Sequence, residues 1–223
     1  MRPSLSVSIL AIFIALALPL AADALGLDVE ANAGAGIGLG STTNPDETGS
    51  PKLAFQGGLE ADVFLVSLGP VDLGLSTGLE YSNLTVSSTT KYPTLSTSAT
   101  FDSTFAYLIV PFAITGRVQL TPAVNLSLRA GGFLGHFLGG ANNNINSPII
   151  PIPSTLDSST TIVGAWGLHF SAGADIRLTG NLFLSPSIIF NYGLTNIQAQ
   201  GGYQYSDTLG SVTGMIGLKY NIL

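Results

Sequence analysis

The sequence contains no cysteine, few charged residues and, beyond its first 24 residues, no long apolar run. Without cysteine the chain can form neither a disulfide framework nor a lipid-modified N-terminal cysteine. Charged residues make up 9% of the chain, whereas roughly a quarter is usual for a soluble domain. No run after the N-terminus approaches the ~18–20 apolar residues of a membrane-spanning helix, and the net charge of −6 argues against nucleic acid as a partner. A weakly charged chain with 27 glycines and no membrane helix is typical of a membrane β-barrel.

Residues 1–24 have the organisation of a secretory signal peptide. Arg2 supplies the positive charge, residues 7–20 form an apolar core, and Ala22-Asp23-Ala24 is a small-x-small cleavage site. We therefore expect export and a single mature domain that spans residues 25–223. An uncleaved membrane anchor is the alternative, which the short apolar core and the cleavage site disfavour.

The clearest pattern is an alternation of side chains across residues 162–195. Side chains on a strand point alternately to opposite faces, so this pattern predicts two strands with one apolar face. A three-residue turn, Thr179-Gly180-Asn181, keeps the alternation in phase and would place Leu178 opposite Leu182 and Phe170 opposite Phe190. Each arm is about three times the usual ~5–6 residues. Long strands with one apolar and one polar face are those of a lipid-embedded barrel.

The same alternation recurs along the chain and predicts eight strands. Their connections are alternately long and short, as in outer-membrane barrels with short periplasmic turns and longer extracellular loops. The fold prediction is therefore all-β, an eight-stranded antiparallel up-and-down transmembrane barrel in the outer membrane, with both termini in the periplasm. The alternation is ambiguous only in residues 105–117. There we favour Ala106, Leu108, Val110, Phe112 and Ile114 facing outward, with Tyr107, Pro111, Thr115 and Arg117 inside.

Charged residues of the predicted strands fall on the polar face, as expected if the other face meets lipid. A Lys or Arg that faces lipid at mid-depth costs ~2–4 kcal/mol. Acids dominate the first three strands and bases the later ones, so opposite charges can meet across a narrow bore. We predict a mid-bore pair of Glu80 and Arg129, and a network nearer the periplasmic end. That network comprises Glu60, Asp62, Asp175, Arg117, Arg177 and Lys219. A static packed interior is the first interpretation, and a gated polar path is the alternative.

Two motifs carry a family resemblance. The segment Gly173-Ala174-Asp175-Ile176-Arg177-Leu178-Thr179-Gly180-Asn181-Leu182 resembles a hairpin common in the porin-like outer-membrane β-barrel superfamily. Tyr107-Leu108-Ile109-Val110-Pro111-Phe112, followed by residues 122–132, is similar to a second strand pair of that group. The resemblance implies a small barrel like OmpW, OmpX or the OmpA transmembrane domain, inserted into outer-membrane lipid by the barrel-assembly machinery and without a cofactor. The chain ends Tyr220-Asn221-Ile222-Leu223, whereas such barrels usually end on an aromatic residue.

Two functional classes follow from this resemblance. An OmpW-like barrel would pass small hydrophobic solutes through its bore or sideways into lipid. The candidate contacts are apolar residues near the loops, namely Phe133, Phe137, Ile149, Ile150 and Ile152. Alternatively, an OmpX-like or OmpA-like barrel would use its Ser/Thr-rich and Asn-rich loops as a structural or adhesive surface that binds an extracellular ligand.

A third class, a lipid-modifying enzyme, is suggested by His169, Ser171 and Asp175. Residues four apart on a strand lie ~13 Å apart, so Asp175 cannot orient His169 for nucleophilic catalysis. We therefore expect no enzymatic activity. Two histidines, His136 and His169, and no cysteine also predict no metal site.

Overall fold

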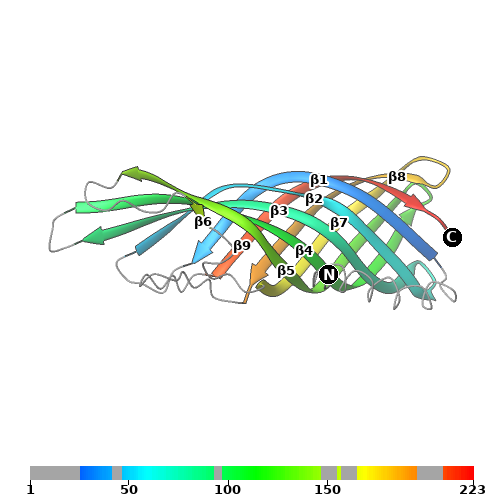
Figure 1. Cartoon of the computed structure of the whole chain (residues 1–223). Coiled ribbons are helices and arrows are strands. Elements are labelled where there is room, and N and C mark those ends of the chain that lie inside the picture. The colour runs from blue at the N-terminus through cyan, green and yellow to red at the C-terminus, as the bar shows by residue number, and fades with distance from the viewer. Residues whose placement is uncertain (1–25, 42–46, 93–96, 147–154, 157–164, 195–207) are drawn as a thin grey trace, which may run out of the picture.

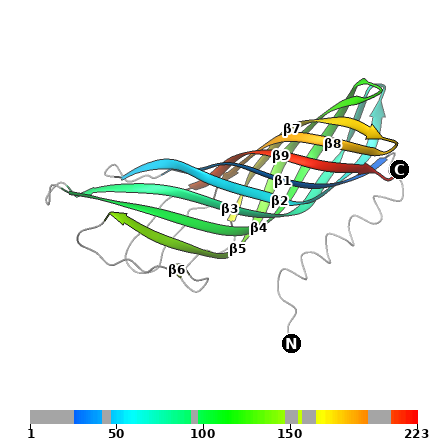
Figure 2. The same ribbon diagram turned by 90° about the horizontal axis from the view of Figure 1, so that it is seen from above.

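The computed structural model of the chain is a closed antiparallel β-barrel (Figures 1 and 2). It describes residues 26–41, 47–92, 97–146, 155–156, 165–194 and 208–223. Among these residues, no helix is long and apolar enough to cross a membrane. The wall consists of β1 (Gly26–Ser41), β2 (Glu47–Leu68), β3 (Val71–Tyr92), β4 (Thr97–Thr121), β5 (Val124–Asn146), β7 (Ala165–Thr179), β8 (Leu182–Gly193) and β9 (Thr208–Asn221).

Each wall strand pairs with its neighbours along the chain, and β9 pairs with β1 to close the ring. The predicted eight-stranded up-and-down barrel is therefore confirmed. One further strand, β6 (Thr155–Leu156), pairs with Gly140 and Ala141 of β5 outside the ring. The sequence did not predict it, because two residues are too few to show an alternation.

The strands are strongly staggered around the ring. The register leads from Asp28 of β1 around all eight strands and returns to β1 at Gly38, ten residues further on. A stagger of this kind requires strands that tilt by roughly 35–45° from the barrel axis. Directly paired residues therefore lie at different depths, and side chains meet in the interior at positions that strand pairing alone does not reveal. The partners along this path are Asp62, Ser76, Ala113, Gly131, His169, Asn191 and Ser211.

Short turns join β2 to β3, β4 to β5 and β7 to β8, and the end of the barrel that carries them is here called the turn end. The β7–β8 turn has two residues, with Gly180 at a φ of 48°. The prediction that Leu178 faces Leu182 is wrong, because Thr179 pairs with Leu182 and the register shifts between Arg177 and Thr179. The shifted residue restores the alternation, and the predicted pair of Phe170 and Phe190 is confirmed.

The outer surface of the wall is apolar around the ring. Large side chains such as Ile114, Ile188 and Ile216 are at least 60% exposed. In β4, Phe112 and Ile114 face outward, whereas Tyr107 and Thr115 are buried in the interior. The favoured alternation of residues 105–117 is therefore confirmed. An exposed apolar surface of this extent requires a lipid environment rather than water.

Four neighbouring strands extend well past the others at the opposite end, here called the loop end (Figure 1). Strands β2 to β5 have 22 to 25 residues, whereas β1, β7, β8 and β9 have 12 to 16. The Ser/Thr-rich segment 87–100, predicted as a break, belongs mostly to β3 and β4. Threonine hydroxyls pair across these strands, Thr85 with Thr104 and Thr89 with Thr100, each at 3.0 Å. Such cross-strand pairs stabilise a sheet that has no apolar face for the sequence to reveal.

Candidate functional site: the barrel interior

Arg129 of β5 is the centre of a buried charge cluster in the half of the interior nearer the turn end. Its guanidinium donates to both carboxylate oxygens of Asp62, with Nε···Oδ1 at 3.0 Å and Nη2···Oδ2 at 2.7 Å. Nη2 also lies 3.0 Å from Oε2 of Glu30, and Nη1 forms an ion pair with Glu60. All four side chains are buried. A planar guanidinium has five donors in a fixed arrangement, so it can bind one carboxylate through two parallel hydrogen bonds and still reach others.

Lys219 of β9 extends the cluster to the opposite wall. Its ammonium lies 2.9 Å from Oδ1 of Asp175, 3.4 Å from Oε2 of Glu30 and 3.7 Å from Oδ2 of Asp62. Ser185 donates a further hydrogen bond of 2.7 Å to Asp175. We call Arg129, Lys219, Glu30, Glu60, Asp62 and Asp175 the charge cluster.

Arg117 forms a separate ion-paired group nearer the turn end. Its guanidinium lies 2.9 Å from Oδ2 of Asp28 and 2.9 Å from Oδ2 of Asp72. It also lies over the ring of Phe64, at 4.1 Å from the centroid. Cation–π contact of this kind stabilises an arginine that has left bulk water.

The structure thus brings together most, but not all, of the predicted network. Glu60 and Asp62 bind Arg129, and Asp175 joins them through Lys219. Arg117 has partners of its own. Arg177 is exposed and lies 5.4 Å from the Phe183 ring centroid, with no ion pair among the described residues. The position of Arg177 beside the β7–β8 turn places it outside the bore.

The predicted pair of Glu80 and Arg129 does not form. Glu80 accepts a hydrogen bond from Gln56 instead, while Arg129 binds Glu30, Glu60 and Asp62. The reason is the stagger of the strands, which places Arg129 at the depth of Glu30. Glu80 lies nearer the loop end. Glu30 is the member of the charge cluster that the sequence reasoning leaves out of the network, although its place in the alternation indicates that it faces the bore.

A series of hydrogen-bonded polar side chains crosses the middle of the interior, on the loop-end side of the charge cluster. His169 Nδ1 and Asn191 Oδ1 are 2.8 Å apart. Asn191 then donates to Gln56 over 3.3 Å, and Gln56 donates to Glu80 over 2.5 Å. Every member of this series is buried. Asp175 binds Ser185 and Lys219 rather than His169, so the three residues considered for catalysis form no triad in this geometry.

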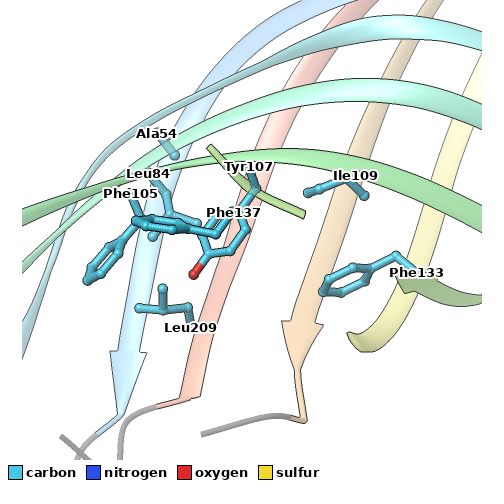
Figure 3. Packing of buried hydrophobic residues seen from close by; sticks show 8 residues of the cluster. All are labelled: Ala54, Leu84, Phe105, Tyr107, Ile109, Phe133, Phe137 and Leu209. Carbon is cyan, nitrogen blue, oxygen red and sulfur yellow. The ribbon is translucent and has the colours of Figure 1, made fainter. Parts of the chain in front are cut away.

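The half of the interior nearer the loop end is lined by apolar side chains (Figure 3). Tyr107 and Phe137 are tilted against each other with ring centroids 5.5 Å apart. The predicted contacts Phe133 and Phe137 both belong to this lining, whereas Ile149, Ile150 and Ile152 lie outside the described residues. We call this set the apolar lining: Ala54, Leu84, Phe105, Tyr107, Ile109, Phe133, Phe137 and Leu209.

A closed barrel with an apolar exterior and ion-paired charges inside is an integral outer-membrane protein. The chain belongs to the family described as outer membrane protein beta-barrel domain, which matches residues 22–199. No curated protein matches the sequence.

Several solved structures are similar in fold. Neisserial surface protein A (NspA) is 16% identical, over 87% of this chain and 96% of that chain, with a TM-score of 0.42. The N-terminal β-barrel domain of Pseudomonas aeruginosa OprF is 17% identical, over 88% and 97%, with a TM-score of 0.41. The outer membrane protein AlkL is 12% identical, over 88% and 90%, with a TM-score of 0.47. These likenesses concern the fold of a small outer-membrane barrel.

Proposed function

We propose that the apolar lining binds small hydrophobic molecules that come from outside the cell, and that they leave the barrel sideways into the outer membrane. The observation that carries this proposal is the apolar lining itself. A membrane barrel needs an apolar exterior, but its interior is ordinarily polar. Eight inward-facing apolar residues at the loop end therefore have no role in meeting lipid, and they offer a hydrophobic surface to a solute.

The charge cluster argues against passage straight through the bore. An eight-stranded barrel is just wide enough for its interior side chains to fill it. A solute on its way to the periplasm would have to separate Arg129 from Glu30, Glu60 and Asp62. Separation of buried charges is strongly unfavourable. A hydrophobic molecule would gain free energy by entering lipid instead.

The proposal predicts that Phe137→Gln weakens binding of a hydrophobic fluorescent probe to the refolded protein by about tenfold, the equivalent of about 1.4 kcal/mol of lost apolar contact. The matched control is Leu138→Gln, since Leu138 is the next residue of β5 and is 50% exposed on the outer face. Probe affinity is measured by fluorescence titration in liposomes. Equal affinities for the two variants and the unchanged protein would contradict the proposal.

A surface role is the second candidate, and the extension of β2 to β5 beyond the other strands favours it. In that case, removal of residues 88–101 would abolish attachment to an external partner and leave probe binding intact. We propose no catalytic role for His169 and Ser171, because both are buried in the bore and Asp175 is held by Lys219. Insertion by the barrel-assembly machinery stays an expectation from the family.

A further inference from the structure

Glu80 is a buried carboxyl group that forms no ion pair with any described residue. Among the described residues, six Asp and Glu side chains are buried. Five of them form ion pairs, with Arg117, Arg129 or Lys219. Glu80 is completely buried, and within the described part of the chain the Gln56 amide is the side-chain donor that binds it. An ionised carboxylate in such a place would be strongly destabilising unless something neutralises it.

The second carboxyl group in contact with Glu80 is Glu60. Glu60 of β2 pairs with Gly78 of β3, and Glu80 pairs with Gly58, so the two buried side chains are diagonal neighbours on the inner face of adjacent strands. Among the described residues, Oε1 of Glu80 has no hydrogen-bond donor. Both oxygens of Glu60 are occupied, Oε1 by the Asn32 amide and Oε2 by Nη1 of Arg129. Two ionised carboxylates have only acceptor oxygens and repel each other, whereas one proton between them supplies the missing donor.

The surrounding hydrogen bonds indicate which residue carries this proton. Glu60 accepts a hydrogen bond of 2.7 Å from Asn32 and pairs with Arg129, so it is stabilised as an anion. Glu80 stands at the end of the series that runs from His169 through Asn191 and Gln56. Each amide of that series donates toward Glu80, and a proton on Glu80 continues the same direction toward Glu60. Hydrogen bonds that all donate in the same direction along such a series polarise one another and become stronger.

We propose that Glu60 and Glu80 form a proton-sharing pair, with the proton on Glu80, which holds the middle of the bore closed. The pair joins β2 to β3 at the side of the charge cluster, of which Glu60 is a member, that faces the apolar lining. Loss of the proton places two negative charges side by side, which drives Glu80 away from Glu60 and loosens the interior at this depth. The proton is thus a bound ligand of the bore.

The titratable groups that surround the pair come from several strands. Glu30 of β1 and Asp62 of β2 are acidic but ion-paired, and Arg129 of β5 and Lys219 of β9 are their partners. His169 of β7 is bonded to Asn191 of β8. The residue of β4 that pairs with Glu80 is Ile109, which is apolar. None of these supplies Glu80 with a counter-charge of its own.

The test is infrared spectroscopy of the refolded protein in lipid at neutral pH. The proposal predicts the carbonyl band of a protonated carboxylic acid, which disappears in Glu80→Gln and persists in Asp72→Asn, an acid outside the pair. Absence of the band from the unchanged protein, or its persistence in Glu80→Gln, would overturn the proposal. The result for the unchanged protein stands even if a variant fails to fold.

Two further measurements separate this account from a merely structural one. Ionic conductance of the unchanged protein in planar bilayers rises reversibly at alkaline pH, whereas Glu80→Gln stays closed because its amide keeps donating to Glu60. Glu60→Gln destabilises the barrel more than Glu80→Gln, because it deprives Arg129 of an anion. Equal alkaline opening of the unchanged protein and Glu80→Gln would contradict the proposal, as would greater destabilisation by Glu80→Gln.

Discussion

Replacement of Arg129 by alanine is expected to lower the free energy of unfolding by about 3–5 kcal/mol, the range for a buried ion pair that loses one partner. The substitution leaves Glu30, Glu60 and Asp62 facing one another, with only Lys219 within ion-pair distance of two of them. Repulsion then adds to the loss of the guanidinium hydrogen bonds. The interior has no room for bulk water to solvate three carboxylates.

The measurement is urea-induced unfolding in lipid or detergent, followed by the fluorescence of Trp166, the one tryptophan of the chain. Arg177→Ala is the matched control, because Arg177 is exposed and outside the charge cluster. That control should change stability by no more than about 0.5 kcal/mol. If both variants lose the same stability, the charge cluster does not hold the barrel together.

Gly36→Val is expected to prevent closure of the barrel. Gly36 pairs with Thr213 at the seam where β1 meets β9. A Cβ atom on Gly36 would overlap the carbonyl oxygen of Val212, which is backbone and cannot swing aside. Ordinary overpacking costs ~1–3 kcal/mol because side chains can adjust. Here the strands themselves would have to separate, so the effect should be larger.

Ala35→Val provides the comparison, because Ala35 is the adjacent residue and faces outward. Folding is measured by the shift in electrophoretic mobility between unheated and heated samples, which reports a closed barrel. Ala35→Val should show the shift of the unchanged protein, and Gly36→Val should show none. A normal shift for Gly36→Val would mean that β1 and β9 do not approach as closely as the structure indicates.

The lipid-facing side of the fold could be predicted from the sequence because a bilayer imposes one simple rule on every strand. Residues such as Leu128 and Ile188 have to be apolar, so the alternation is visible in the sequence. The rule does not apply beyond the membrane, and there the prediction missed the continuation of β3 and β4 through the Ser/Thr-rich segment. Polar residues on both faces of a sheet produce no period.

The arrangement of the bore could be predicted only in part. The alternation identified which charges face inward, but contacts across the bore depend on stagger and depth, which no local pattern encodes. Arg129 was therefore assigned to Glu80 rather than to Glu30. The apolar residues Ile189 and Met215 also face the interior and are almost completely buried. Only their position in the two-residue alternation distinguishes them from the apolar residues of the same strands that face lipid.

The most direct test of the inverted arrangement uses β5 and the absence of native cysteine. A nitroxide is attached to single cysteines at positions 126, 127 and 128, and its collisions with oxygen dissolved in the bilayer are measured. Leu126 and Leu128 are 42% and 58% exposed on the outside, whereas Ser127 is 7% exposed in the bore. High oxygen collision rates at 126 and 128 and a low rate at 127 are predicted. A high rate at 127, or contact of 126 and 128 with a water-soluble relaxation agent, would contradict the account.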